Sequence, residues 1–334
     1  MSDPDAPNAR TLTPGSRDLN RASLMVCVEA AIAAPSVLNS QPWRFRIRGG
    51  GIDVFADWNR QLQGIDPSGR ELLISIGAAV FNLRVAMRQQ ARAPLMSWWP
   101  EPAEPDLVAR VVPGQPASPG GGLSMFAEAI PRRHTNRRPF ARVLVPGSVL
   151  DDLAEAARLE GATLRVADPV GRAAILSLVH TADERLQAQG IYRTERTAWM
   201  PASHHRRDGM PPQAFGPWDA MEALPMRDFG LNRPQLRRRG EQLEPYPTLV
   251  VLSTNGDSAD AWLRAGQALQ RVLLAATVHG LAATPVSQPL EIPALRELVT
   301  DTAAGQWAQV ILRLGYGQPT TASSRRPLTE VLVA

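Results

Sequence analysis

The chain has 334 residues, of which 44% are hydrophobic and 20% charged, a composition typical of a globular protein with a large core. No run of about 18 apolar residues predicts a membrane span, and the polar N-terminus lacks the apolar segment of a secretion signal. Cys27 is the sole cysteine, which excludes an intramolecular disulfide and a cysteine-rich metal site. We therefore expect a cytoplasmic protein of roughly two domains, or of one domain with two halves.

All 36 basic residues are arginine, and the formal net charge is only +4. Arginine keeps its charge at working pH, and codon composition is a sufficient explanation for its exclusive use. The arginine-rich runs at residues 132–138 and 237–239 are short and separate, and no long basic tract is interleaved with aromatic residues. The sequence therefore predicts no nucleic-acid partner.

The first part of the chain predicts helices and strands that follow a flexible arm over residues 1–20. Leu24, Val28 and Ile32 recur every four residues in the first helix, which Pro35 ends. Apolar residues then alternate with arginines, which indicates a half-buried strand of a hairpin. The predicted elements are helix 21–33, strand 43–47, a return strand from residue 52, helix 71–92 and strand 107–112.

Residues 113–122 are rich in glycine and proline and predict a linker between two halves, 21–125 and 126–334. Residues 190–244 show no sustained period, which predicts an irregular, lid-like insert or a mobile loop. The remaining elements expected in the second half are helices 126–130, 147–159, 169–187 and 260–280, and strands 163–166, 248–253 and 308–314.

Two of these helical segments, residues 77–94 and 266–283, resemble each other. With Gly77 set on Gly266, small or apolar residues coincide at several further positions. The matching pairs are Ala79 and Ala268, Val80 and Leu269, Leu83 and Val272, Val85 and Leu274, and Ala86 and Ala275. The match predicts an internal duplication, in which one chain folds as a pseudo-dimer and a site can lie between its halves.

Common motifs of nucleotide-binding proteins, hydrolases and thiol redox proteins are missing from the sequence. The histidines lack metal-ligand spacing, and the adjacent His204 and His205 would point in different directions on any regular element. We therefore predict no metal site. The five histidines are His134, His180, His204, His205 and His279.

The segment Ala34 to Trp43, APSVLNSQPW, is one of two that can carry chemistry. Two prolines stiffen it, and the amides of Asn39 and Gln41 can both donate and accept hydrogen bonds. That combination suits the edge of a heteroaromatic ring. The alternative is an ordinary loop between a helix and a strand, with Ser36 as a helix cap.

The segment Arg132 to Phe140, RRHTNRRPF, is the other. Several guanidinium groups and the hydroxyl of Thr135 suit a phosphate dianion, which accepts charge-assisted, bidentate hydrogen bonds. The alternative is a solvated basic loop.

With these two segments the sequence resembles the nitroreductase superfamily of FMN-binding proteins, and within it the Acg type of two fused nitroreductase-like halves. In that superfamily one segment meets the FMN phosphate and another the isoalloxazine ring. The phosphate segment is matched with Thr in place of Ser and one extra residue before Phe140. Its matching residues are Arg133, His134, Thr135, Arg137 and Phe140. The ring segment is matched without a gap by Pro35, Ser36, Asn39, Gln41, Pro42 and Trp43.

The resemblance continues to the C-terminus. Residues 261–289 are similar to the family's helix and following loop, which implies that Pro285, Ser287 and Gln288 lie along the flavin. Residues 312–332 resemble the family's last strand and tail, which makes Arg325 a second phosphate ligand, or Arg326 if the register shifts by one. The implied fold is an α+β, nitroreductase-like fold, with the two halves forming an intrachain pseudo-dimer.

The duplication and the resemblance together imply one FMN per chain. The first half has the ring segment without a counterpart of the arginine segment, and the second half has the reverse. One site would therefore form between the halves of a single chain, and we expect a monomer.

The resemblance implies hydride transfer from NAD(P)H through FMN to nitro or quinone acceptors, with no catalytic side chain. One alternative is a flavin-sequestering or storage protein in which the insert covers the cofactor, and another is an interaction protein that has lost the flavin. Six residues of the insert could pack on the flavin ring; the alternative is that they form a small apolar core of their own, a satellite core, under a loop. They are Trp199, Met200, Met210, Phe215, Trp218 and Met221. The expected partners are FMN, NAD(P)H and a small aromatic acceptor, without a membrane.

Overall fold

The computed structural model describes residues 19–118, 122–200, 206–220, 224–227, 229 and 238–334. Nearly all of the arm expected over residues 1–20 lies outside the described residues, as do His204, His205 and Met221. No helix in the described part is both long and apolar enough to cross a membrane.

Helices and strands in the described ranges form an α+β fold, so the expected class is confirmed. The α-helices are α1 (Arg21–Ile32), α2 (Arg70–Gln89), α3 (Gly147–Arg158), α4 (Pro169–Ala188), α5 (Gly190–Ala198), α6 (Ala259–Val278), α7 (Pro293–Val299) and α8 (Leu328–Val331). The strands are β1 (Trp43–Arg48), β2 (Gly51–Ala56), β3 (Arg92–Trp98), β4 (Leu107–Pro116), β5 (Ala162–Val166), β6 (Trp218–Asp219), β7 (Gly240–Glu241), β8 (Thr248–Asn255), β9 (Ala282–Pro285) and β10 (Gln306–Gly315).

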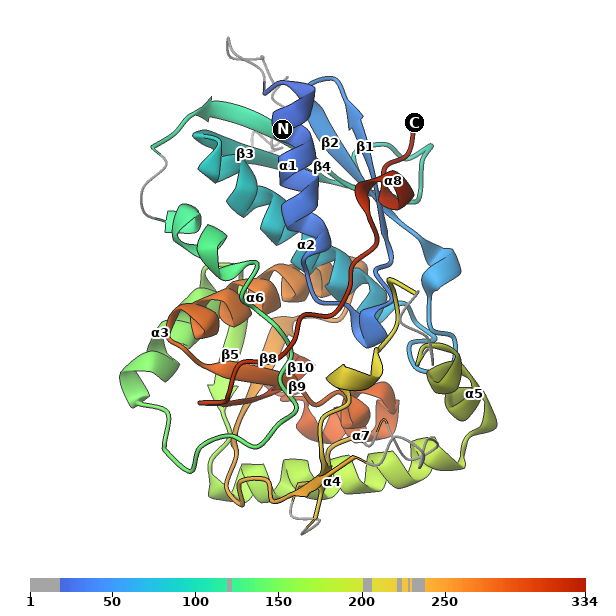
Figure 1. The fold of residues 1–334 in the computed structure, drawn as a ribbon, viewed down its shortest axis with the longest axis vertical. Coiled ribbons are helices and arrows are strands. Elements are labelled where there is room, and N and C mark those ends of the chain that lie inside the picture. The colour runs from blue at the N-terminus through green and yellow to red at the C-terminus, as the bar shows by residue number, and fades with distance from the viewer. Residues whose placement is uncertain (1–18, 119–121, 201–205, 221–223, 228, 230–237) are drawn as a thin grey trace, which may run out of the picture.

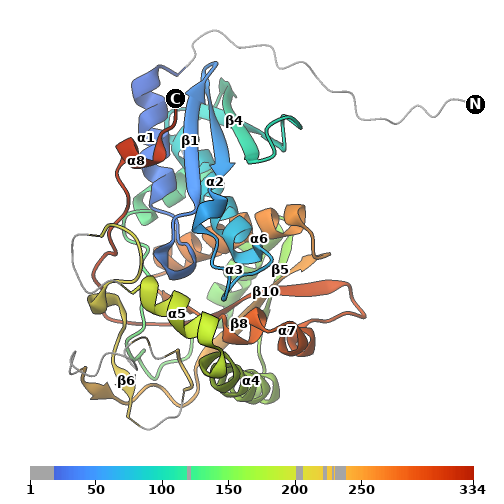
Figure 2. The same ribbon diagram turned by 90° about the vertical axis from the view of Figure 1, so that its right-hand side faces the viewer.

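Two four-stranded antiparallel sheets dominate the described structure, in the orders β1-β2-β4-β3 and β5-β8-β10-β9. In Figures 1 and 2 the first sheet lies above and the second below, with α2 and α6 between them. Each sheet contributes to its own apolar core, and α2 has side chains in both. This double burial explains why every residue in the central run of α2, residues 72–81, is apolar or small.

Helices α2 and α6 cross at the two glycines that the sequence comparison superimposes. A Cβ on Gly77 would lie 2.2 Å from the carbonyl oxygen of Leu263, and one on Gly266 would lie 2.0 Å from that of Ile74. Only a residue without a side chain allows the helices to approach so closely. The reciprocal contact fits a pseudo-twofold relation between the halves, and their origin by duplication stays a proposal.

The C-terminal segment leaves the second sheet and returns to the first (Figure 1). Leu332 forms a β-bridge with Phe45, and the amide of Val333 donates to the Phe45 carbonyl over 2.8 Å. Val331 is fully buried in the core of the first sheet. The chain therefore carries residues 323–325 along the boundary between the halves.

The described residues of the insert over 190–244 contain more regular structure than the sequence indicates. It begins with α5 and contains the short parallel strands β6 and β7. Five of its described residues belong to a small apolar core that also includes Leu38, Leu62 and Ile65 of the first half. The five are Tyr192, Met200, Met210, Phe215 and Phe229, so most of this apolar material forms a satellite core.

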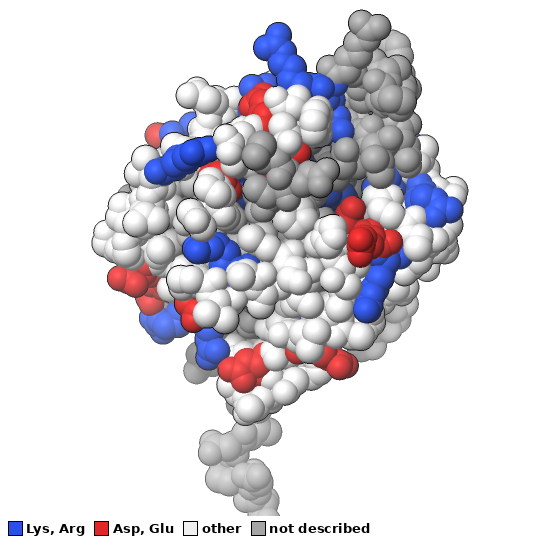
Figure 3. All heavy atoms as spheres, turned by 90° about the horizontal axis from the view of Figure 1, so that it is seen from below, with Lys and Arg blue, Asp and Glu red and all other residues white. Residues whose placement is uncertain are grey.

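Figure 3 shows one face of the molecule, on which arginines and acidic residues are interspersed among neutral ones. The described residues on this face form no continuous basic surface. That distribution agrees with the low net charge.

Candidate functional site

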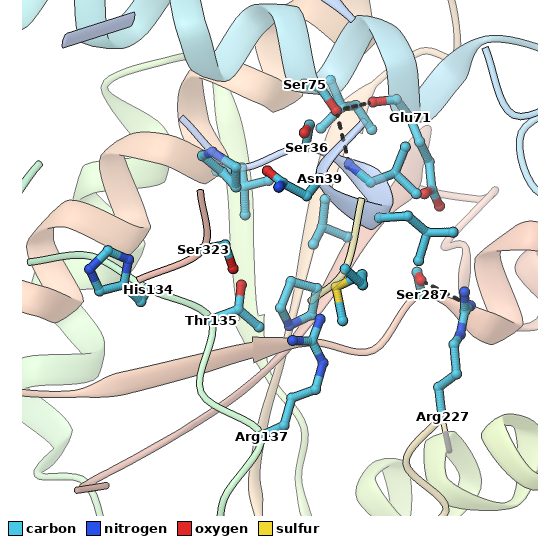
Figure 4. Close-up of a pocket in the computed structure, with 18 of the residues that line it drawn as sticks. Ser36, Asn39, Glu71, Ser75, His134, Thr135, Arg137, Arg227, Ser287 and Ser323 are labelled. Atoms are coloured by element: carbon cyan, nitrogen blue, oxygen red, sulfur yellow. Dashed lines mark hydrogen bonds between the residues drawn. The ribbon is translucent and has the colours of Figure 1, made fainter. Parts of the chain in front are cut away.

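A cleft between the two halves receives residues from both (Figure 4). Together with the space that opens to solvent, it has a volume of about 1070 Å³. Its walls come from the segment after α1, the first turns of α2, the loop after β9, strand β10 and the C-terminal segment. Ten of the twelve residues expected around the flavin line it: Pro35, Ser36, Asn39, Arg133, His134, Thr135, Arg137, Pro285, Ser287 and Arg325.

The arginine-rich segment lies along the edge of the second sheet. Thr135 forms a bridge with Ala283 of β9, and the amide of Asn136 donates to the Ala283 carbonyl over 3.0 Å. The hydroxyl of Thr284 in turn donates to the carbonyl of Asn136. These backbone bonds fix the segment in an extended form, and both Arg133 and Arg137 line the cleft.

Arg133, which is buried, and Arg325, which is half-buried, place two positive charges at one end of the cleft. Arg133 is 5% exposed, and among the described residues its side chain donates only to the carbonyl of Ala33, over 3.3 Å. Arg325 donates to backbone carbonyls and to Oδ1 of Asn39 over 3.0 Å. The buried Nε atoms of both arginines have no hydrogen-bond partner in the part of the chain that the structure describes. Burial, and for Arg133 also the neighbouring Arg325, lowers their pKa values to about 9 and about 10.

Arg137 and His134 extend this basic region. Arg137 donates to the carbonyl of Ala214 over 3.0 Å, and its guanidinium lies 4.8 Å from the centre of the Phe229 ring. Burial, followed by repulsion from Arg227, lowers the pKa of Arg137 to about 10. Burial and the positive charges of Arg133 and Arg325 also lower the pKa of His134. The imidazole is therefore neutral at physiological pH, and arginines supply the charge.

The segment after α1 turns sharply through three residues with positive φ: Leu38, Asn39 and Gln41, at 45°, 56° and 51°. Ser36 does not cap a helix with its side chain; its hydroxyl accepts from the amide of Gln41 over 2.9 Å and closes the turn. The Asn39 amide donates to the carbonyls of Gly209 and Ser324 over 3.0 and 3.1 Å. Asn39 thus ties the insert and the C-terminal segment to the cleft wall.

Gln41 and Gln288 differ from the expectation, because neither lines the cleft. Gln41 is fully buried; it donates to the carbonyl of Arg207 over 2.9 Å and accepts from the amide of Arg326 over 2.8 Å. The positive φ at Gln41 belongs to the turn that places its side chain there. Gln288 is 2% exposed and begins a short helical turn, Gln288–Glu291, of which Leu290 lines the cleft.

The two adjacent C-terminal arginines, Arg325 and Arg326, differ in whether they line the cleft. Arg325 lines the cleft, whereas the Arg326 side chain donates to the carbonyl of Glu330 over 2.7 Å and to that of Gln41 over 3.3 Å. The alignment without a shift, which selects Arg325 rather than Arg326, is therefore the one that places an arginine at the basic end of the cleft.

Residues that the sequence did not single out complete the other end of the cleft. Glu71, Ser75 and Gln309 line it, together with Arg227 and Phe229 of the insert. In Figure 4, Glu71, Ser287 and Arg227 lie on one side, and His134, Thr135 and Ser323 on the other. Arg227 forms a buried ion pair with Glu291, and Ser287 donates to the same carboxylate over 2.8 Å. A single charged residue in an aperiodic insert offers no sequence signal for such a pairing.

Among the insert residues considered for ring contact, Met210 lines the cleft. Met200 and Phe215 are buried in the satellite core, with Trp199 packed against it, and Trp218 is 46% exposed. The described residues contain no group of His, Cys, Asp or Glu that could hold a metal ion. The cleft can therefore accommodate an elongated organic molecule with an anionic end.

Comparisons with known proteins place these observations in a family. A model of the Nitroreductase family matches residues 130–316, more than half of the chain. A Mycobacterium tuberculosis H37Rv protein named "Putative NAD(P)H nitroreductase Rv3131" is 33% identical over 314 residues, which cover 90% of this chain and 88% of that protein. "Putative NAD(P)H nitroreductase acg" of the same strain is 29% identical, over 91% of this chain and 93% of that protein.

Similar solved structures include the FMN-dependent nitroreductase NfnB from Mycobacterium smegmatis in complex with NADPH. It is 19% identical with a TM-score of 0.39, and the match covers 63% of this chain and 97% of that chain. A nitroreductase with bound FMN from Desulfitobacterium hafniense DCB-2 is 14% identical with a TM-score of 0.40, over 63% of this chain and 97% of that one.

The family model and the relatives confirm the resemblance found in the sequence, including the similarity to the Acg type. The relatives match almost from end to end, so the similarity includes the first half of the chain, which the family model does not match. The chain belongs to the nitroreductase family.

Proposed function

We propose that this protein is a cytoplasmic, monomeric oxidoreductase that holds one FMN in the cleft between its halves. In this proposal the enzyme transfers a hydride from NAD(P)H, through the flavin, to nitro or quinone acceptors. The observation that carries it is the basic end of the cleft. There, Arg133 is buried, Arg137 and Arg325 are half-buried, and none of the three has a carboxylate partner among the described residues.

The residues present fit the phosphate of FMN. Withdrawing a charged group from water without a counter-ion is unfavourable, so one buried and two half-buried arginines in one cleft favour an anionic ligand. The unpartnered Nε atoms of Arg133 and Arg325 are donors that a phosphate oxygen would satisfy. Thr135, with Ser323 beside it in Figure 4, adds a hydroxyl at the same end.

The rest of the cleft fits a flat, largely apolar ring. Pro35, Leu38 and Leu269 come from the two halves and line it, with Met210 and Phe229 from the insert. FMN, when bound, supplies the capacity to accept and pass on a hydride. The chain's own residues then bind the phosphate, enclose the ring and exclude water. Asn39 would contribute mainly by shaping the wall, because its side chain is already hydrogen-bonded within the protein.

The visible spectrum of the purified protein, before and after anaerobic addition of NADPH, tests this proposal. A flavin spectrum that bleaches promptly supports an open reductase. Protein that stays colourless after FMN is added and the excess is removed would overturn it, and would favour the interaction protein that has lost its flavin.

Flavin storage is a second candidate, and the contacts of the insert favour it. Asn39 and Gln41 donate to the carbonyls of Gly209 and Arg207, and Arg227 pairs with Glu291 beside Ser287. These bonds hold the insert against the cleft. Tight FMN binding with a spectrum that NADPH does not bleach would favour storage over turnover.

A further inference from the structure

We propose that Glu71 is the proton donor of this cleft, which delivers a proton to the acceptor when the acceptor takes a hydride. The inference rests on the proposed function, which itself assigned no catalytic side chain. Glu71 lies at the start of α2 and lines the cleft. Figure 4 shows its side chain extending from the helix toward Ser287 and Arg227, away from the basic end.

The two oxygens of Glu71 have different surroundings. Arg70 donates to Oε1 over 3.1 Å, and no residue in the described part of the chain is hydrogen-bonded to Oε2. The side chain keeps 12% of its surface accessible. A protonated Glu71 can therefore accept from Arg70 with one oxygen and present the O–H of the other to a molecule in the cleft.

The charges around Glu71 favour its protonated form. Glu71 interacts electrostatically with Glu291, Arg70, Asp66 and Arg227, so its own carboxyl group and two others face two guanidinium groups. The ion pair of Asp257 and Arg296 lies next to Arg70 and is neutral as a unit. Glu195, which repulsion from Glu291 also affects, accepts from the amides of Gly64 and Ile65. One proton among the three carboxyls balances the cluster.

Glu71 is the carboxyl best suited to hold that proton. Glu291 accepts from Arg227 and Ser287, and Asp66 accepts from the amide of Leu72 over 2.8 Å. Burial, and then repulsion from Glu291, raises the pKa of Glu71 to about 8, whereas that of Asp66 is raised to about 6. At neutral pH the Glu71 proton is retained and can still be lost, as a general acid requires.

With a quinone as the acceptor, the reduction needs one hydride and one proton. One carbonyl oxygen gains a hydrogen with two electrons from the hydride, which NAD(P)H supplies through the cofactor. The other carbonyl oxygen takes the proton of Glu71, so the quinone becomes the hydroquinone and Glu71 becomes a carboxylate. The carboxylate regains its proton from solvent through the open part of the cleft.

Rapid mixing of the FMN-loaded protein tests the step with Glu71→Gln, which keeps an acceptor for Arg70. After reduction with NADPH, reoxidation of the variant by menadione should be at least about 100-fold slower than that of the wild type at pH 7. Ferricyanide takes an electron without a proton, so its rate should be unchanged. Glu195→Gln, a nearby carboxyl that does not line the cleft, should react normally with both oxidants.

The pH dependence separates a proton donor from a merely structural residue. The wild-type rate with menadione should fall above about pH 8, and the fall should be absent in Glu71→Gln. Glu291→Gln removes a negative charge beside Glu71 and should move the fall to lower pH. Equal rates for wild type and Glu71→Gln with menadione, or equal slowing with menadione and ferricyanide, would overturn the proposal.

Infrared spectroscopy of the flavin-free protein gives a readout that does not depend on activity. The wild type should show the band of a protonated carboxyl group at pH 7. This band should disappear as the pH is raised, with a midpoint at about pH 8, and Glu71→Gln should lack it. A protein that shows this band without binding FMN would refute the proposed function but not the state of Glu71. A protein that binds FMN without this band would refute the proton donor alone.

Discussion

The two ends of the cleft contain the same residue type in opposite electrostatic states. Arg133 is buried and Arg325 half-buried, both without a carboxylate among the described residues, whereas the buried Arg227 is paired with Glu291. An unpaired buried guanidinium is a cost of folding that a ligand can remove, and a paired one is part of the folded structure. We propose that, within this cleft, the lack of a carboxylate partner marks the arginines that bind the ligand, and that the paired Arg227 is structural.

The largest effect on stability should come from removal of the paired arginine, Arg227. Arg227→Met leaves Glu291 buried without its counter-ion and should lower the free energy of unfolding by about 3–5 kcal/mol. Arg133→Met removes an unpaired charge and should leave the flavin-free protein as stable as the wild type or more so. Urea unfolding at pH 7 measures both, and equal destabilisation by the two substitutions would contradict the comparison.

Removal of the unpaired arginine should act on the ligand instead. Arg133→Ala should weaken FMN binding by about 1.5–3 kcal/mol, because it deletes a hydrogen bond to a charged group. Riboflavin, which lacks the phosphate, should bind both proteins equally, as fluorescence titration would show. The neighbouring Arg132 is exposed and provides the matched control, Arg132→Ala, with FMN affinity unchanged. A loss for riboflavin as large as that for FMN would place Arg133 elsewhere than at the phosphate.

The carboxyl end should make stability depend on pH. Burial raises the pKa of Glu71 to about 8 from its ordinary value of 4.5, so between these values the folded protein binds a proton that the unfolded chain does not. The stability of the wild type should therefore fall as pH rises through this window, by up to about 1.4 kcal/mol per pH unit. Glu71→Gln should show a shallower fall in thermal unfolding of the flavin-free protein. Parallel pH profiles would contradict the assignment.

A smaller effect should come from a simple anion. Inorganic phosphate at about ten times its dissociation constant should stabilise the flavin-free wild type by about 1.4 kcal/mol, through binding to the folded state. Arg133→Met should lose this gain in thermal unfolding, and Arg227→Met should keep it. Sodium chloride at equal ionic strength is the control, and stabilisation of Arg133→Met by phosphate would show that the anion binds elsewhere.

The sequence predicted the elements with clear periodicity and the family. The alternation after Pro42 became β1, and the helix around Gly77 became α2. The first helix of the insert, α5, was missed because its nine residues are mostly polar and border an aperiodic segment. Its buried Tyr192 packs on the first half, a tertiary contact that local pattern does not encode.

The candidate site was predictable where the family motif is contiguous, and less so where side-chain direction decides. Arg133 and Asn39 line the cleft. The Gln41 side chain instead joins a buried hydrogen-bond network, because positive φ values at Leu38, Asn39 and Gln41 reorient the segment. Glu71 and Arg227 come from distant parts of the chain, and only the fold brings them together. No spacing in the sequence indicates that one of three carboxyls would be left to hold a proton.

The central claim is that one chain builds one FMN site between its halves, and native mass spectrometry of the FMN-reconstituted protein tests it most directly. The account predicts a single-chain species that carries one FMN, and an Arg133→Ala species that loses the flavin at lower collision energy. A single chain without flavin, or flavin found only in a two-chain species, would contradict it.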